Sequence, residues 1–330
     1  MRAALAATGR VVRAEAFRLL RKRRVYVLAG LWWVGLPVAV LVLARVLQVT
    51  LTGSFVEGEA VPVKTLLQGL ASPFGVARVG LVAPAYLSPS PYVIAVALLA
   101  AAGLGEPRTH RMWKSTLVSE PDRRAVLAGT FLTMQAFLGV LLAGAFVFGA
   151  AFGALGTTFL PTAVEGTWGR LASLYLLQWA HLAALLAFAS LAIFVLRNVT
   201  LGVVTTFFLP PLLEGLYAVW RATAGFEPLN RVNALFQTLQ LQATLEALPR
   251  WFLSTNLYLP ARTSAAPLLD EVIGNLQALG EEAGGGPGGA QIASLLGADL
   301  TLPHAGLVMA VYFAAFATAL TIAFLRRDVA

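Results

Sequence analysis

The sequence has no cysteine, which excludes disulfide bonds, thiolate chemistry and cysteine-ligated metal sites. Histidine is also scarce. The three in the chain, His110, His181 and His304, fall on different segments, and no metal-ligand or nucleophile pattern surrounds them. Charged residues make up only 12% of the chain, about half the share that a soluble domain carries. These shortages argue against a metalloenzyme and against an ordinary soluble fold.

Hydrophobic residues form 58% of the sequence and gather in runs of roughly twenty, the length that crosses about 30 Å of hydrocarbon as a helix. The run YVLAGLWWVGLPVAVLVLARVL shows no polar–apolar alternation, which excludes the strands of a membrane barrel, about ten residues long. Inside lipid a helix satisfies its own backbone groups. The sequence therefore predicts an all-α integral membrane protein.

We expect about six transmembrane helices, one for each apolar run. They cover residues 25–47, 89–105, 126–155, 171–196, 199–220 and 304–325. The first run is longer than the apolar part of a signal peptide, and no clear small-x-small cleavage site follows it, so we interpret it as a retained span. The chain then divides into a basic N-terminal segment (1–24), five spans (25–220), an outer region (221–303) and a last span with a short tail (304–330).

The positions of the basic residues predict which side of the membrane each loop faces. Of the 24 lysines and arginines, 16 lie in four segments that share one side of the six-span layout: 1–24, 106–124, 197–198 and 326–330. Because positively charged loops stay in the cytoplasm, we expect both termini there, with the protein in the cell membrane. Since the net charge of +8 comes from basic residues at the ends of apolar runs, no nucleic-acid partner is expected.

The outer region 221–303 is expected to be partly helical. Apolar residues recur at helical spacing within 232–239 and 268–279, and Gly284–Gly289 has the composition of a flexible linker. Because these stretches also contain polar residues, we expect the helices to lie on the outer membrane face or against the span ends. A partial crossing is the alternative.

The N-terminal segment predicts an amphipathic helix. Its apolar face consists of Val12, Ala16, Leu19 and Leu20. Basic residues flank this face, namely Arg13, Arg18, Arg21 and Lys22. Such a helix would lie in the inner headgroup layer with its basic side chains on lipid phosphates. A plain positively charged anchor is the alternative.

The loop 106–124 combines an amphipathic stretch with a helix breaker. Its apolar residues are Met112, Trp113, Leu117 and Val118. Pro121 ends this stretch, and Arg123 and Arg124 anchor the start of the following span. A short helix held at the membrane surface can transmit force from a soluble partner to the spans. An ordinary basic loop is the alternative.

Taken together, these segments resemble the permease subunits of type-2 ABC exporters. In that family a Glu followed by basic residues, here Glu15 and Arg18–Arg24, marks an interfacial elbow helix, and a second Glu, here Glu106, opens the cytoplasmic loop after the second span. The family's loop pattern, Gly-Thr-Leu-Arg-x-Leu-Leu-Ser-x-Pro-Val-Ser-Arg and then Gly-Lys, is matched in part by HRMWKSTLVSEPDRRAVLAGT. This stretch keeps Leu117, Ser119, Pro121, Arg123 or Arg124, and Gly129, but lacks the Gly-Thr pair and has Thr130 in place of the Lys.

The resemblance implies a dimer of six-span subunits among membrane lipids, driven by an ATPase subunit that docks under the elbow helix and the loop. The residues implied in coupling to that ATPase are Glu15, Glu106, Trp113, Lys114, Leu117, Ser119, Pro121, Arg123 and Arg124. The chain has no phosphate-binding Gly-x-x-x-x-Gly-Lys-Ser/Thr motif, so ATP and Mg²⁺ are expected in the partner and no cofactor is expected in this chain.

Polar residues within the predicted spans are candidates for a transport pathway, because such residues are costly in lipid. Gln135, Gln178 and His181 lie deepest, and the last two share one helix face. Hydrogen bonding between helices is the alternative role for all three. Small residues of the third span, including Gly149 and Gly153, are expected to allow close helix packing.

Two other functions remain open. A secondary transporter would carry charged residues at the membrane midplane or broken helices in matching halves. The predicted spans are almost free of charge, which counts against ion coupling. The exception is Glu214, near the outer end of the fifth span, which we expect to meet Arg221 or Arg45. A membrane subunit that transports nothing itself is the second alternative.

Overall fold

The computed structural model describes residues 2–52, 67–87, 89–109, 112–120, 122–223, 242–264 and 300–326. Regular structure throughout these residues is helical, and they contain no strand. The predicted all-α fold is therefore confirmed.

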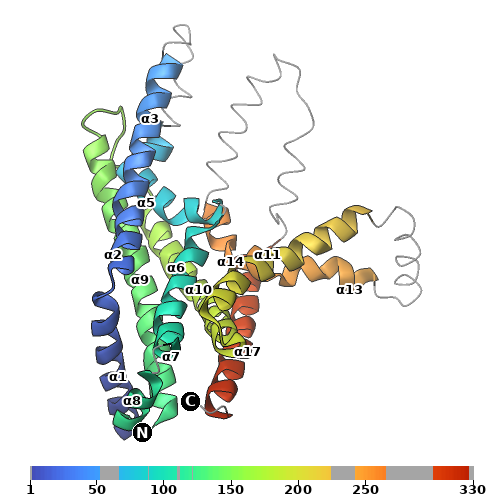
Figure 1. Cartoon of the computed structure of the whole chain (residues 1–330). Helices are drawn as coiled ribbons and strands as arrows, with labels where there is room; N and C mark the ends of the chain where they lie inside the picture. Colours follow the sequence, from blue (N-terminus) through green and yellow to red (C-terminus); the bar gives the residue numbers. More distant parts are fainter. Residues whose placement is uncertain are drawn as a thin grey trace.

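The described residues contain five helices that are long and apolar enough to cross a membrane (Figure 1). The first runs from Arg23 to Thr50, through α2 (Arg23–Gly30), a π-helical turn η1 (Leu31–Gly35) and α3 (Leu36–Thr52). The others are α9 (Arg123–Gly156), α10 (Trp168–Leu196), α11 (Val199–Thr223) and α17 (Leu302–Arg326). Each coincides with a predicted span to within a few residues.

The predicted second span, 89–105, is a shorter apolar helix. α6 (Pro91–Ala100) continues through a second π-helical turn, η3 (Ala101–Gly105), into α7 (Glu106–Thr109). The apolar part ends at Gly105 and is shorter than the five long helices, so the count of six spans stays a prediction.

One helix that precedes α6, α5 (Pro73–Val82), was not expected from the sequence. Ser72 caps it by accepting a hydrogen bond from the N–H of Gly75, 2.9 Å away, and Pro73 occupies its first turn. A 3₁₀ turn, η2 (Ala83–Ala85), ends it. At 10 residues, α5 is too short to give a transmembrane pattern.

Glycines of α9 allow α5 to approach it closely. A Cβ atom added at Gly153 would lie 2.5 Å from the Cα of Pro73, and one at Gly149 would lie 2.7 Å from the Cα of Ala77. The two helix backbones are therefore in direct contact. This confirms the close packing expected at these small residues, with α5 as the partner.

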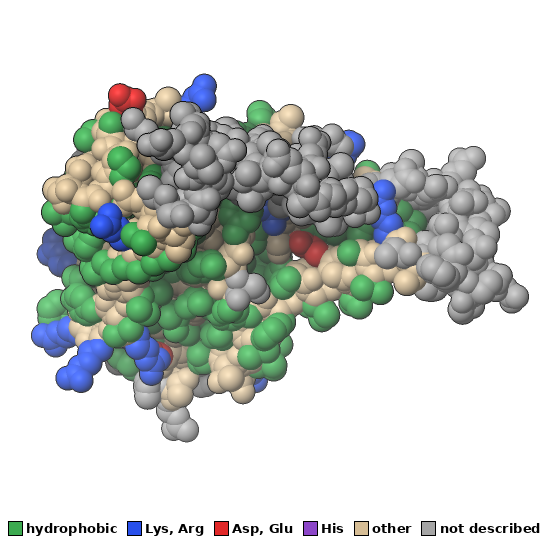
Figure 2. Space-filling model, turned by 90° about the horizontal axis from the view of Figure 1, so that it is seen from above, with side chains coloured by type: hydrophobic (Ala, Val, Ile, Leu, Met, Phe, Trp, Pro, Cys, Tyr) green, Lys and Arg blue, Asp and Glu red, His purple; other side chains and the backbone are tan. Residues whose placement is uncertain are grey.

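α10 is the central helix of the bundle. It contacts α6, α9, α11 and α17, and it is the most completely buried of the five long helices. Leu182, Leu185 and Leu186 are fully buried within it. In contrast, only a small part of α11 and of α17 is buried. Seen from the end opposite the termini, many hydrophobic side chains lie on the described surface (Figure 2).

α10 and α11 form a tight helical hairpin. Arg197 adopts a left-handed conformation with φ 56°, which ends α10 and reverses the chain. The side-chain oxygen of Asn198 then accepts a hydrogen bond from the N–H of Leu201, 3.1 Å away. The predicted two-residue connection between these helices is confirmed.

Of the outer region, the structure describes residues 242–264 and 300–303, besides 221–223 at the end of α11. The first part folds into α13 (Gln242–Ala247), η4 (Leu248–Trp251), α14 (Leu253–Leu257) and a further helical segment, 259–264. α14 packs against α10, α11 and α17. The stretches 232–239 and 268–279 and the linker 284–289 lie outside the described residues.

Both ends of the described chain lie at the same end of the bundle (Figure 1). The guanidinium of Arg123, at the start of α9, lies 3.5 Å from the carbonyl oxygen of Leu325, near the end of α17. We call this end the basic end and define it by α1 (Arg2–Leu20), η3, α7, α8 (Met112–Ser119), the first turn of α9 and the last turn of α17.

Candidate functional site

α1 packs along the first part of α9 through an apolar face. Ala7, Val11 and Leu19 are buried, and a Cβ atom at Gly129 of α9 would lie 2.7 Å from a methyl carbon of Val11. Of the face predicted from the sequence, Leu19 is buried, whereas Leu20 is 51% exposed. Val12 and Ala16 are half-buried, so the protein covers part of the predicted face and leaves Leu20 outside.

The charged part of this inward face bonds to the second π-helical turn. Arg18 donates to the carbonyl oxygens of Ala102 (3.0 Å) and Gly103 (3.1 Å), and Lys22 donates to that of Ala102 (3.2 Å). A π-helical turn interrupts the regular i to i−4 bonding, which leaves carbonyl groups for other donors. Arg18 and Lys22, which the sequence placed on lipid phosphates, are therefore bound within the protein.

Both glutamates singled out by the resemblance lie in this cluster. Glu15 forms an ion pair with Arg18 at 2.5 Å. Burial raises the pKa of the Glu15 carboxyl, while the charges of Arg18 and Lys22 oppose the rise. Glu106 pairs with Lys22 and lies 3.5 Å from Arg24. Glu106 thus joins the start of α7 to the N-terminal part of the chain, a contact that the linear sequence could not reveal, whereas Glu15 pairs within α1.

α8 is anchored by one of its predicted apolar residues. Trp113 is 2% exposed and makes an edge-to-face contact with Phe324 of α17, with ring centroids 5.3 Å apart. Leu117, one turn later, is half-buried against the core. Met112 and Val118 are exposed, Val118 at 86%. α8 therefore turns one edge inward and presents the other on the surface of the basic end.

The connection from α8 to α9 is held by two carboxylates. Glu120 forms an ion pair with Arg10 of α1 at 2.6 Å. Asp122 caps α9 by accepting hydrogen bonds from the N–H groups of Arg124 (3.0 Å) and Ala125 (3.3 Å). Arg123 is half-buried and Arg124 is exposed. Pro121 and the side chains of Lys114 and Ser119 lie outside the described part of the structure.

The three pathway candidates all make hydrogen bonds to backbone carbonyls. Gln135 donates to the carbonyl of Trp179, and the Trp179 indole donates to that of Gln135, both at 2.8 Å. Gln178 donates to the carbonyl of Leu257 in α14 at 3.2 Å, and a ring nitrogen of His181 lies 2.6 Å from the carbonyl of its own helix at Leu177. Gln135 and Gln178 thus join helices, which favours the alternative given for them above.

Glu214 of α11 has a different partner from those expected. Its carboxylate accepts a hydrogen bond from the N–H of Ser254, 2.8 Å away at the start of α14. Arg45 donates instead to the side chain of Gln48 at 2.7 Å, and within the described residues neither Arg45 nor Arg221 forms an ion pair with Glu214. A search of the sequence for a basic partner of Glu214 could not have found Ser254, because the donor is the backbone N–H of Ser254.

No group of three or more potential metal-ligating side chains occurs within the described ranges. Comparisons of the chain with protein families, with curated proteins and with solved structures give no match.

Proposed function

We propose that the chain is the membrane-spanning permease subunit of an ATP-driven exporter of the type-2 ABC kind, working as a dimer with a separate ATPase. The main support is the basic end, where α1, the α7–α8 segment and the last turn of α17 are joined by ion pairs and by the Trp113–Phe324 contact. These elements are far apart in the sequence, so a force applied to α8 would reach three parts of the bundle.

In this proposal the basic end faces the cytoplasm of the cell, and six spans place both termini there. The sixth span is α6 with η3, residues 91–105, whose helix continues into α7 at the basic end. At 1.5 Å per residue this apolar part is about 22 Å long, so the bilayer would have to be locally thinner around it. α1 is the elbow helix, and the exposed apolar surfaces of α11 and α17 contact lipid or the second subunit.

The docking surface for the ATPase is the exposed edge of α8 with the adjacent start of α9. Val118 and Arg124 are exposed there. Trp113 and Leu117 lie on the inward side of α8 and pack against the bundle. This divides the coupling residues implied by the resemblance into two kinds. Some would touch the partner, and others, including Glu15 and Glu106, would transmit its movement to the spans.

Co-purification tests this proposal. The chain is co-expressed with a candidate ATPase subunit and purified through a tag on this chain, with Val118→Glu and Arg124→Glu as test variants. Arg221→Glu, an exposed position at the other end of the bundle, is the matched control. We expect both test variants to lose the ATPase at unchanged expression and the control to keep it. Failure of any ATPase to associate, or equal loss in all three variants, would contradict the proposal.

One observation favours the secondary transporter as the second candidate. Glu214 is the sole Asp or Glu in the five long apolar helices, and an acidic residue inside a span is a candidate for ion coupling. A secondary transporter would work in ATP-free vesicles under a proton gradient and would lose that activity in Glu214→Gln. An exporter driven by ATP would show no gradient-driven transport in either form.

A further inference from the structure

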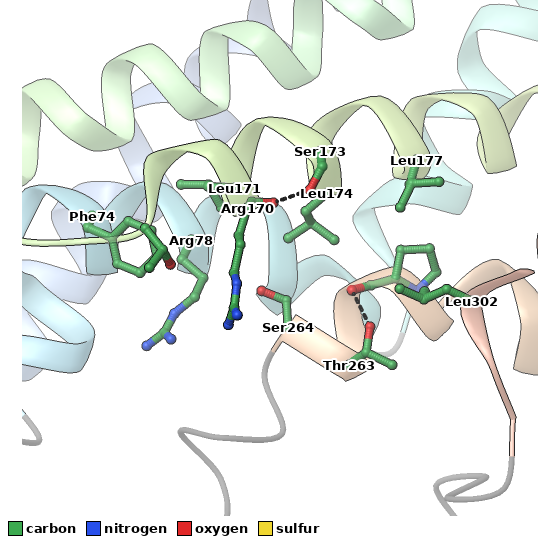
Figure 3. Close-up of a pocket in the computed structure, with 12 residues that line it drawn as sticks. Phe74, Arg78, Arg170, Leu171, Ser173, Leu174, Leu177, Thr263, Ser264 and Leu302 are labelled. Atoms are coloured by element: carbon green, nitrogen blue, oxygen red, sulfur yellow. Dashed lines mark hydrogen bonds between the residues drawn. The ribbon is translucent and has the colours of Figure 1, made fainter.

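A cavity of about 360 Å³ lies at the end of the bundle opposite the basic end (Figure 3). It is enclosed by α5, the first turns of α10, the helical segment 259–264 and the start of α17. This volume falls within the range of small-molecule binding sites, roughly 300–1,000 Å³. The walls combine apolar side chains with two arginines and several hydroxyl groups, so the cavity has the composition of a site for an amphiphilic molecule.

Two guanidinium groups enter this cavity from different helices. Arg78 of α5 is half-buried, donates to the carbonyl of Gly69 at 2.9 Å, and lies with its guanidinium carbon 5.5 Å from the centre of the Phe74 ring. These contacts fix the direction of its side chain. Arg170, in the first turn of α10, is exposed and extends beside Arg78 in the same direction (Figure 3). None of the 12 described residues that line the cavity is acidic.

The surroundings of the arginines divide into a polar and an apolar part. Ser264 lies next to the Arg170 side chain and presents a further polar group to the same space (Figure 3). Leu171, Leu174 and Leu177, on successive turns of α10, form an apolar wall that leads away from the guanidinium groups. A molecule with an anionic head and a hydrocarbon part would match both regions at once.

We propose that this cavity binds a phosphate group through Arg78 and Arg170, with the leucine wall of α10 receiving the hydrocarbon part of an anionic amphiphile. The two guanidinium groups come from different helices and reach the same cavity, so one anion can contact both. The planar guanidinium fork suits phosphate oxygens, which it can bind in pairs. This site does not depend on the exporter function.

Equilibrium binding to the purified full-length chain in neutral detergent tests the site. The probes are a short-chain phosphatidic acid, inorganic phosphate, and the matching short-chain diacylglycerol, which lacks the phosphate. We expect phosphatidic acid to bind at least tenfold more tightly than the diacylglycerol, and Arg170→Gln and Arg78→Gln each to weaken it about tenfold. Arg45→Gln, an exposed arginine on α3 outside the cavity, should leave binding unchanged.

Each probe separates one possible source of the anion. Phosphatidic acid binding tighter than inorganic phosphate supports a lipid-like ligand, and equal affinity for the two supports a free phosphate at the same arginines. Arg78→Lys keeps the charge if Arg78→Gln fails to fold, and we expect it to weaken binding less than Arg78→Gln does, because a lysine attracts phosphate but cannot bind its oxygens in pairs. Equal affinity for phosphatidic acid and diacylglycerol, or an Arg170→Gln variant that binds like the unmodified chain, would overturn the proposal.

Discussion

The two ends of the bundle are held together by different forces. At the basic end, the apolar contact of α1 with α9 is supplemented by ion pairs. Lys22–Glu106 joins the α1–α2 connection to α7, and Arg10–Glu120 joins α1 to the α8–α9 connection. At the opposite end, α5 and α9 meet backbone to backbone at glycines, and Arg78 and Arg170 line a cavity. The strength of an ion pair falls as salt rises, and its side chains can change partners. Close-packed backbones are insensitive to salt and cannot rearrange in this way. The basic end therefore suits movement, and the opposite end suits a fixed frame.

The largest effect is expected at the basic end, from the contact between Trp113 of α8 and Phe324 of α17. Trp113→Ala should destabilise the protein by about 3–5 kcal/mol, because it removes a buried aromatic side chain from Phe324. Val118→Ala, on the exposed edge of the same helix, should change stability by less than about 0.5 kcal/mol. Thermal or denaturant unfolding in detergent measures both. Equal effects would mean that α8 is not anchored through Trp113.

The opposite end is tested at its glycine contact. Gly153→Val should cost about 3 kcal/mol, the upper part of the usual range for overpacking, because the new side chain meets the backbone of Pro73. Gly215→Val is the control, since nothing lies within 4 Å of a Cβ atom at Gly215 of α11. The loss should be the same at low and high salt. A loss that disappears in high salt would contradict the distinction between the two ends.

Glu106→Ala should cost about 1–2 kcal/mol, because Lys22 and Arg24 lose a charged partner in a partly exposed site. Glu165→Ala, in the exposed connection between α9 and α10, serves as control for the loss of one carboxylate. Unfolding in detergent and ATPase co-purification should both be measured. Unchanged stability in Glu106→Ala would show that this ion pair does not join α1 to α6.

The smallest effect is expected at the most exposed ion pair. Arg10 is 67% exposed, so its pairing with Glu120 should contribute about 0.2–1 kcal/mol and should vanish at high salt. A double-mutant cycle with Arg10→Ala and Glu120→Ala, run at about 0.05 M and 1 M salt, isolates this coupling. Coupling of the same size at both salt concentrations would show that the pair is more buried than described.

The long apolar helices could be predicted from the sequence because each satisfies a local rule. About twenty apolar residues are enough to define a span, and Pro or Arg-Asn pairs mark the ends. α5 could not be predicted, because a 10-residue helix between prolines resembles a loop until α9 provides a glycine surface for it. The contacts of Arg18 were missed for a related reason, since the carbonyl groups of η3 come within its reach only when the chain has folded.

In the candidate sites, too, single residues could be named from the sequence, but their distant partners could not. The coupling residues were named from a resemblance, and the sequence could not show that Trp113 meets Phe324 or that Glu106 meets Lys22, because these partners are distant along the chain. The cavity at the opposite end had no sequence signal at all. Arg78 and Arg170 belong to separate helices, and only the fold brings them together.

The side of the membrane to which the basic end is exposed is the most direct test of the proposed function. The chain has no cysteine, so Val118→Cys on α8 and Val164→Cys in the connection between α9 and α10 can each be labelled alone; Val118 is 86% exposed and Val164 is 67% exposed. With a membrane-impermeant maleimide on intact cells, we expect labelling at position 164 and none at position 118 until the cells are opened. Labelling at 118 in intact cells, with 164 protected, would place α8 outside and contradict coupling to a cytoplasmic ATPase.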